Sequence, residues 1–310
     1  MAARHTSPLQ ALLVDERFDG DIYAHEPMAR HTSYRIGGPA RFYVRVGSVG
    51  ALTRLVEVCE SQGVPWVAVG RGTNLLVADE GFPGVVVSLG RDFRSFRVDE
   101  ERHCIVAGAG VLLSAVVQEA FKRSLAGLEF AVGTPGTVGG ALRMNAGSRD
   151  EWIGSRVASV TTLVPGQGLV RRAGSELAWG YRTSSFDTCE TVLECELSVE
   201  PGDPFYIRGK MEANLARRKK SQPMNAACCG SVFRNPEGKS AAALVEGLGL
   251  KGAAVGGARV SDVHANFIVN DGEATARDVR ALISLIQAKV YEAYGIELAP
   301  EVRFLGFDGE

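Results

Sequence analysis

The stretch from Val132 to Ser148 reads VGTPGTVGGALRMNAGS and is rich in glycine. Five glycines fall within these seventeen residues, together with Pro135 and the small hydroxyl residues Thr134 and Thr137. Each glycine inside a helix or strand costs roughly 0.5–1 kcal/mol relative to alanine, so the stretch favours a loop whose backbone approaches something closely. Backbone N–H groups in such loops bind phosphate, which predicts a phosphate site. A long surface loop with ordinary turns is the alternative.

The composition is that of an ordinary globular chain. Its 310 residues are 45% apolar and 23% charged, which predicts two or three domains. A net charge of -2 argues against nucleic-acid binding through a basic surface. No segment is apolar over the roughly eighteen residues that a membrane helix needs, and the first residues lack a signal-peptide core. We therefore expect a cytoplasmic protein without membrane insertion.

Cysteine and histidine spacing predicts no metal site. The six cysteines form no C-x-x-C pair, and the five histidines are scattered. In a reducing compartment the cysteines are expected to be free thiols, including the adjacent Cys228 and Cys229.

Periodicity predicts alternating helices and strands. Ser48 is expected to cap a helix that ends at Gly63, and Thr275 a longer helix that ends at Gly295. Alternating residues over 156–200 predict a mixed sheet. The first thirty residues are expected to form an arm with a short amphipathic piece, and the sequence PGDP at 201–204 is the strongest domain boundary.

Two glycine pairs resemble dinucleotide fingerprints, and both fail. After Gly70 and Gly72 the third glycine position holds Leu75 and no helical pattern follows, whereas after Gly108 and Gly110 it holds Leu113. No loop carries the glycine-lysine-hydroxyl end of a P-loop. With these two phosphate-binding motifs excluded, we expect two loops, 70–75 and 133–147, to face one pyrophosphate from two sides.

Further motifs follow in order along the chain: GRGTNLLV from Gly70, GYRTSSF from Gly180, CGSVFRNP from Cys229 and LAPEVRFLG from Leu298. With the glycine-rich stretch, they resemble the UDP-N-acetylenolpyruvoylglucosamine reductases, flavoenzymes of peptidoglycan precursor synthesis. The resemblance runs from about His31 to Phe307. The motif GRGTN is shared with the wider vanillyl-alcohol-oxidase-like flavoproteins, whereas the C-terminal motifs are more specific.

The resemblance implies an α+β fold. It implies an N-terminal arm (1–30), a two-subdomain FAD-binding region of the PCMH type (31–200) and a smaller substrate-binding domain (207–307), in the shorter, type II form of the enzyme. The chain departs from the family pattern at Arg71 and at residues 148–150, both near the expected flavin contacts.

The resemblance also implies non-covalent FAD, with NADPH as reductant. The expected cofactor-binding residues are those of the two glycine-rich loops and the arginine of GYRTS: Gly70, Arg71, Gly72, Thr73, Asn74, Leu75, Gly133, Pro135, Gly136, Thr137, Gly139, Gly140, Asn145, Ala146 and Arg182. The expected substrate-binding residues are Tyr181, Lys219, Asn235 and Lys251.

The implied reaction adds hydride to C3 of an enolpyruvyl ether and a proton to C2, forming UDP-N-acetylmuramate. Negative charge develops on C2 and its carboxylate, so the site needs a fixed cation and a proton donor. Arg182 matches the cation, Ser231 the proton donor and Glu301 the third catalytic residue. The structural alternatives are a solvated arginine at a strand end, a turn serine after Gly230, and a surface ion pair of Glu301 with Arg303.

Other functions remain as alternatives. One is a different FAD-dependent oxidase or dehydrogenase of the same fold, and another is a flavin-binding scaffold without catalysis. The basic run at 217–220 either meets the UDP diphosphate or is a solvated helix end. The expected partners are a UDP-linked substrate and NADPH, with no obligate protein partner.

Overall fold

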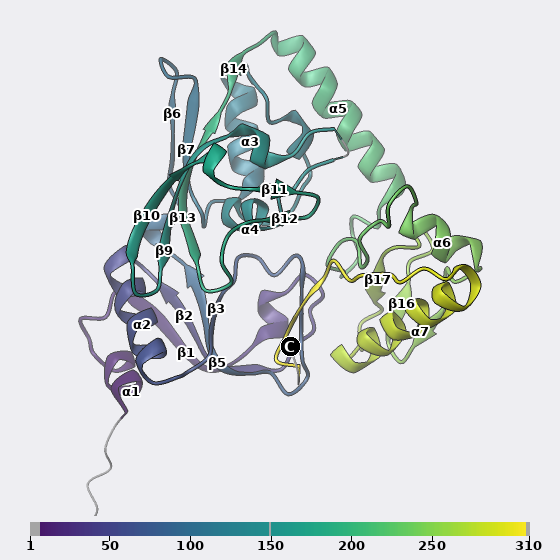
Figure 1. Cartoon of the computed structure of the whole chain (residues 1–310), viewed down its shortest axis with the longest axis horizontal. Helices are drawn as coiled ribbons and strands as arrows, with labels where there is room; N and C mark the ends of the chain where they lie inside the picture. Colours follow the sequence, from purple (N-terminus) through teal and green to yellow (C-terminus); the bar gives the residue numbers. More distant parts are fainter. Residues whose placement is uncertain (1–6, 149, 308–310) are drawn as a thin grey trace, which may run out of the picture. The chain divides into compact units, whose positions relative to one another are not determined.

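The computed structural model describes residues 7–148 and 150–307 and divides the chain into two compact units (Figure 1). Residues 1–6 of the expected arm and Arg149 lie outside the described residues. Unit 1 comprises the residues up to His25, Arg41–Gly70 and Pro83–Asn214. Unit 2 comprises Glu26–Ala40, Arg71–Phe82 and the residues from Leu215 onward. The mixture of helices and sheets confirms the predicted α+β class.

A four-stranded sheet with two helices opens unit 1. Its strands, in spatial order, are β1 (Gly20–Pro27), β2 (Pro39–Val46), β5 (Phe82–Leu89) and β3 (Trp66–Ala68), and the helices are α1 (Pro8–Leu13) and α2 (Val49–Ser61). Ser48 caps α2 as predicted, because its side chain accepts a hydrogen bond from the N–H of Ala51. Leu52 and Leu55 of α2 are fully buried in a core shared with β2 and β5. Strand β1 is mostly exposed, so it lacks the apolar alternation that would have predicted it.

A five-stranded sheet forms the second layer of unit 1. Its spatial order is β10 (Gly168–Ala173), β9 (Val157–Val164), β13 (Thr191–Ser198), β7 (Cys104–Gly108) and β6 (Phe96–Asp99). All four pairings are antiparallel, which corrects the prediction of a mixed sheet over residues 156–200. The two sheets share one core, because Leu163 of β9 and Leu193 of β13 are buried with the apolar face of α2.

The other elements of unit 1 connect and cover this sheet. They are α3 (Leu113–Lys122), α4 (Val138–Arg143), the pairs β8 (Leu125–Ala126) with β14 (Glu200–Pro201) and β11 (Trp179–Gly180) with β12 (Thr183–Ser184), and α5 (Pro204–Ser221), which continues into unit 2. One-turn 3-10 helices occupy Arg91–Phe93 (η2), Glu129–Ala131 (η3), Ile153–Arg156 (η4) and Gly174–Glu176 (η5). Helix α4 packs on β7 and β13, which places the glycine-rich stretch against the middle of the sheet.

Unit 2 packs two helices on small sheets. Its elements are η1 (Met28–His31), β4 (Leu75–Val77), α6 (Ala241–Gly247), β15 (Ala254–Val255), β16 (Ala258–Val260), β17 (Ile268–Asn270), α7 (Ala276–Tyr294) and β18 (Arg303–Leu305). Thr275 caps α7 and Gly295 ends it at φ 65°, both as predicted. Strand β18 pairs in parallel with β4, so residues more than two hundred positions apart form one small sheet.

The glycine-rich stretch contains a helix, which the glycine count argues against. Helix α4 begins at Val138, and Gly139 and Gly140 lie in its first turn. The reason is local crowding: a Cβ at Gly139 would lie 2.9 Å from the Cβ of Ala109 and 3.2 Å from its carbonyl oxygen. A glycine is therefore required at 139 for contact with the protein itself, whereas a Cβ at Gly140 would meet only Thr137 Oγ1 at 3.5 Å.

This difference predicts opposite effects for two neighbouring substitutions. Gly139→Ala should destabilise the protein by about 1–3 kcal/mol, because the new methyl group overpacks against Ala109. Gly140→Ala is the matched control; it should leave stability unchanged or raise it by up to about 1 kcal/mol, because alanine favours the helix. Thermal unfolding of both variants beside the parent protein measures this. A melting temperature of Gly139→Ala equal to that of Gly140→Ala would contradict the close contact.

Candidate active site

The glycine-rich stretch is hydrogen-bonded along the segment that leads into α3. The N–H of Leu113 donates to Gly136 O at 3.1 Å, and the N–H of Val138 donates to Val111 O at 2.9 Å. Thr137, between them, forms an isolated antiparallel bridge with Leu112 and caps α4. These bonds fix the path of the backbone just before α4.

The first glycine-rich loop touches the second at one point in unit 1. A Cβ at Gly70 would lie 2.6 Å from Thr137 Oγ1, so the absence of a side chain at 70 lets the two backbones approach. The rest of that loop belongs to unit 2. There Gly72 has φ 59° and packs on His31, and its carbonyl accepts a hydrogen bond from the N–H of Ser33 at 3.1 Å. The structure therefore brings together Gly70 and Thr137, two of the expected cofactor-binding residues.

The backbone near Thr137 suits a diphosphate group. Within the described part of the chain, the N–H groups of Gly133, Gly136 and Thr137 donate no hydrogen bond. Gly133 and Gly136 have φ of 71° and 111°, a conformation that glycine adopts without strain. Unengaged amides on closely packed backbone are the donors that anionic phosphates need. The residues present therefore fit the pyrophosphate of FAD.

Other expected cofactor residues use their amides inside the protein. The N–H of Gly139 donates to Ala109 O at 2.9 Å, that of Gly140 to Thr137 Oγ1 at 3.3 Å, and that of Ala146 to Ala141 O at 2.8 Å. Pro135 has no N–H to donate. These residues shape the loop, whereas Gly133, Gly136 and Thr137 are among the described residues whose N–H groups remain available as donors.

Arg182 lies in a tight turn between β11 and β12 and adopts φ 55°, a conformation that is rare for a residue with a side chain. Its Nη1 donates to Gly147 O at 3.0 Å, and its guanidinium carbon lies 5.4 Å from the centre of the Tyr181 ring. Asn145 holds the same hairpin, since its Nδ2 donates to Gly180 O at 2.8 Å. The expected catalytic arginine is thus attached to the end of the glycine-rich stretch.

Ser231 begins a segment that is held from two sides within unit 2. The N–H of Val232 donates to Asn266 O at 2.9 Å, and the N–H of Glu301 donates to Val232 O at 2.7 Å. Gly230, with φ 84°, provides the sharp turn just before the serine. Ser231 and Glu301 are both half-buried. Ser231 and Glu301 lie seventy positions apart in the sequence. In the structure, Glu301 is hydrogen-bonded to Val232, the residue that directly follows Ser231.

Asn74 connects the first glycine-rich loop to the same place. Its Nδ2 donates to Glu301 O at 3.1 Å, and its carbonyl accepts from the N–H of Arg303 at 3.0 Å. Strand β18 starts at Arg303, so Glu301 precedes the strand.

The expected substrate-binding residues belong to both units. Tyr181 is exposed in unit 1, and Lys219 is exposed in the last turn of α5. Asn235 is exposed, and its Oδ1 accepts from the N–H of Ala241 at 3.0 Å. Lys251 donates to Glu246 at 2.6 Å. A basic last turn also stabilises the C-terminus of α5, so both interpretations of the 217–220 run stay open.

Electrostatics near Ser231 keep its neighbours neutral. Burial raises the pKa of the Cys229 thiol far above its usual value, and the charge of Glu301 acts in the same direction. Burial also raises the pKa of Cys228. Burial, followed by the charge of Lys251, lowers the pKa of His264 below its usual value. These cysteines are therefore protonated at neutral pH, and the six cysteines are free thiols, as predicted.

Asn266 is a residue near the candidate site that was not predicted from the sequence. This residue is 4% exposed and makes three hydrogen bonds to the segment that follows Ser231. The available signal was a lone carboxamide in the run from Ala265 to Val269, where every other residue is apolar and buried. A buried polar side chain requires partners, so its presence in such a run marks a specific contact.

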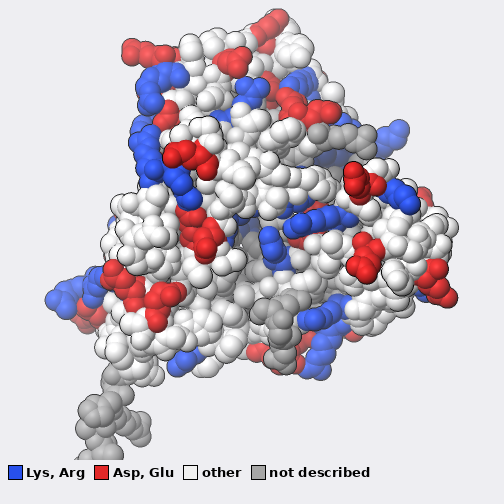
Figure 2. All heavy atoms as spheres, viewed as in Figure 1, with Lys and Arg blue, Asp and Glu red and all other residues white. Residues whose placement is uncertain are grey.

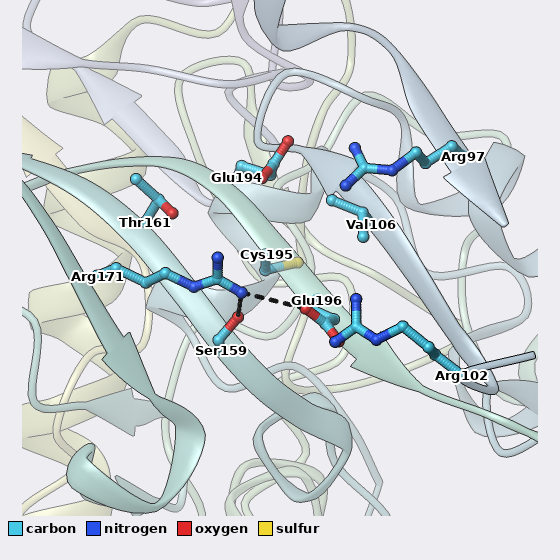
Figure 3. Close-up of a pocket in the computed structure, with 9 residues that line it drawn as sticks. All are labelled: Arg97, Arg102, Val106, Ser159, Thr161, Arg171, Glu194, Cys195 and Glu196. Atoms are coloured by element: carbon cyan, nitrogen blue, oxygen red, sulfur yellow. Dashed lines mark hydrogen bonds and ion pairs between the residues drawn. The ribbon is translucent and has the colours of Figure 1, made fainter. Parts of the chain in front are cut away.

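A cavity of about 80 Å³ lies on one face of the five-stranded sheet, away from the expected site residues. Figure 2 shows basic side chains gathered on the side of unit 1 where β6, β7 and β10 lie in Figure 1. In Figure 3, Arg102 and Arg171 approach Glu196 from opposite sides, at 2.6 Å and 3.3 Å. The buried Glu196 thus balances two arginines, and none of the expected site residues lines this cavity.

No helix in residues 7–148 or 150–307 has the length and apolar character required to cross a membrane. In the same residues, no group of three or more metal-ligating side chains is placed to hold an ion.

Comparison with known proteins gives a consistent result. Residues 222–305 match the model of the UDP-N-acetylenolpyruvoylglucosamine reductase C-terminal domain, and residues 40–174 match an FAD binding domain. The chain is 44% identical to the UDP-N-acetylenolpyruvoylglucosamine reductase of Heliobacterium modesticaldum, over 94% of this chain and 93% of that one. It is 38% identical to the enzyme of the same name from Bacillus subtilis, over 94% and 96% of the two chains.

A solved structure agrees over the same length. The crystal structure of UDP-N-acetylenolpyruvylglucosamine reductase from Thermus caldophilus superposes with a TM-score of 0.80 and 33% identity, covering 92% of this chain and 98% of that one. The identities and coverage are high enough to show kinship over nearly the full chain. The chain therefore belongs to the UDP-N-acetylenolpyruvoylglucosamine reductase family, a family of oxidoreductases that use FAD and NADPH.

Proposed function

We propose that the protein reduces the enolpyruvyl ether of UDP-N-acetylglucosamine-enolpyruvate to UDP-N-acetylmuramate, with NADPH as the reductant. The observation that carries the proposal is the hydrogen bond of 2.7 Å from Glu301 N–H to Val232 O. It holds Glu301 beside the residue that follows Ser231, and the family resemblance implies a catalytic role for both Ser231 and Glu301.

The glycine-rich loops would hold FAD. The amides of Gly133, Gly136 and Thr137 are the available donors for its pyrophosphate, and Gly70 leaves room beside Thr137. When bound, FAD supplies the hydride that it has received from NADPH. We propose that NADPH and the nucleotide substrate use one site in turn, which accounts for the lack of a separate nicotinamide fingerprint.

Each catalytic residue has one proposed task. Arg182 presents a planar guanidinium that can bind the substrate carboxylate at two points and stabilise the negative charge that develops there. Ser231 donates its hydroxyl proton to C2, a carbon more basic than the serine alkoxide that remains. Glu301, held beside Val232, assists this transfer. The remaining assignments, including the division into a cofactor domain over 31–200 and a substrate domain over 207–307, belong to the same proposal.

The strained turn at Arg182 supports a functional role. A residue with a side chain in the left-handed region costs about 1–2 kcal/mol, and glycine would remove most of that cost. A turn that keeps arginine here gives up stability to place a guanidinium beside Gly147. Strained residues cluster at functional sites, and Arg182 shares its positive φ with His25, Arg35, His103, Ser124 and Asn145 among the described residues.

Ser231→Ala tests the proposed reaction. The purified variant should carry FAD, visible as a flavin absorption spectrum, and NADPH should reduce that flavin at the rate of the parent protein. Turnover of the enolpyruvyl nucleotide should fall by roughly 100-fold or more, because the general acid is missing. Anaerobic stopped-flow measurements separate the two half-reactions.

Three results would contradict parts of this proposal. A colourless parent protein that binds no added FAD would exclude the flavin chemistry. A yellow parent protein without substrate-dependent NADPH oxidation would instead support a scaffold. Turnover of Ser231→Ala close to that of the parent would assign the proton to another donor.

Arg182→Ala and Arg182→Gly form a matched pair. Both lack the guanidinium, so turnover should fall in both by roughly 100-fold or more. Arg182→Gly should nevertheless be the more stable of the two by about 1 kcal/mol, since only alanine keeps the left-handed strain. Melting temperatures and steady-state rates measure these effects. Equal stabilities would refute the strain, and retained turnover would refute the catalytic role.

A further inference from the structure

Asn266 is a polar residue inside the apolar core of unit 2. It is 4% exposed, between Ala265 and Phe267, which are equally buried. Its own N–H donates to His264 Nδ1 at 3.1 Å. Because burial lowers the pKa of His264, its ring is neutral at neutral pH, and the bond from Asn266 N–H selects the tautomer in which Nδ1 is the acceptor. The backbone of Asn266 is therefore held independently of its side chain.

The side chain of Asn266 bonds to both polar groups of one peptide residue. Its Oδ1 accepts from the N–H of Phe233 at 2.9 Å, and its Nδ2 donates to Phe233 O at 2.8 Å. Its carbonyl also accepts from the N–H of Val232 at 2.9 Å. Only a carboxamide can accept and donate in this geometry, since a carboxylate lacks the N–H and an aliphatic chain lacks both groups.

The opposite side of the same segment faces the residues that precede β18. Glu301 N–H donates to Val232 O, and Arg234 N–H donates to Ala299 O at 2.9 Å. Residues 232–234 thus lie between Asn266 and the chain that carries Glu301, as a central strand lies between two neighbours. Ser231 is the residue immediately before this clamped segment, and the backbone at Gly230 is free to turn.

We propose that Asn266 is a positioning residue that fixes the hydroxyl of Ser231 relative to Glu301. The inference rests on the proposed role of Ser231 as proton donor. Proton transfer to carbon requires the donor within hydrogen-bond reach of C2, and a misplacement of about 1 Å can cost roughly 100-fold in rate. Without the carboxamide, one side of the clamp keeps only the Val232 bond, and the serine loses its fixed position.

A purely structural role for Asn266 makes a different prediction. Loss of a buried hydrogen-bonding side chain lowers stability, and with it FAD content and both half-reactions together. Positioning of Ser231 affects only the step that uses the serine. The two roles are therefore separated by the half-reactions and not by stability.

The test compares Asn266→Asp with Asn270→Asp. Asn270 lies at the end of β17, and its carboxamide also joins distant backbone, donating to Tyr34 O at 2.9 Å and accepting from Gly272 N–H at 2.8 Å. It makes no side-chain bond to residues 231–234 among the hydrogen bonds described here. Both substitutions keep the shape of the side chain and remove the N–H donor.

In stopped-flow experiments on the FAD-loaded full chain, NADPH should reduce the flavin of both variants within threefold of the parent rate. Reoxidation by the enolpyruvyl nucleotide should slow roughly 10- to 100-fold in Asn266→Asp and change little in Asn270→Asp. The KM for the nucleotide should stay within threefold of the parent value while kcat falls. Asn266→Ala, which buries no charge, should show the same selectivity if the aspartate variant folds poorly.

A double variant with Ser231→Ala separates the positioning role of Asn266 from the proposed role of Ser231 as proton donor. Adding Asn266→Ala to Ser231→Ala should slow reoxidation no further, because the residue acts through the serine. A further tenfold loss, or an equal loss in both half-reactions, would overturn the positioning role while leaving the proposed reaction intact. Full turnover of Ser231→Ala alone would overturn the role of Ser231, and the inference about Asn266 with it.

Discussion

Unit 1 depends on one close contact, the hydrogen bond of 2.9 Å from Gly139 N–H to Ala109 O at a point where a Cβ has no room. This contact allows α4 to begin against β7, and it fixes Thr137 at the start of that helix. Thr137 then meets Gly70, and beyond α4 the chain reaches Gly147, which accepts the hydrogen bond of Arg182. The glycines that resemble a ligand cradle therefore serve two purposes. Some allow two segments of the chain to pack closely, and others leave backbone N–H groups available to a ligand.

In unit 2, side-chain carboxamides hold the backbone in place, as the close contact at Gly139 does in unit 1. Asn266 holds residues 232 and 233, Glu301 bonds the other side of that segment, and Asn74 bonds the carbonyl of Glu301. Hydrogen-bonded networks of this type fix a single arrangement when every member has a partner. The result is a set of hydrogen-bonded backbone segments that carry Ser231 and Glu301, two of the residues proposed to act in catalysis.

Local signals in the sequence were sufficient for much of the fold. Ser48 and Thr275 cap α2 and α7 because each hydroxyl lies just before an apolar helical pattern. The missing pieces depend on distant contacts. Helix α4 contains glycine, a poor helix former, because Ala109 lies too close for a side chain at 139. Strand β1 is too exposed to show an alternation of apolar and polar residues. In the candidate site, motif residues such as Ser231 were identifiable from resemblance. Asn266 was marked only by being a lone carboxamide in an apolar run, and its partners at 232 and 233 depend on contacts that are distant in sequence.

The parallel pairing of β4 with β18 has a consequence for the order of events during synthesis. Leu76 and Val77 of β4 are fully buried, but their partner strand, Arg303–Leu305, leaves the ribosome more than two hundred residues later. Until then β4 presents an unpaired, apolar edge, which is the kind of surface that associates with other chains. Unit 2 therefore completes its fold only after residues Arg303–Leu305 have emerged, and a nascent chain interrupted before Arg303 carries an exposed site for aggregation.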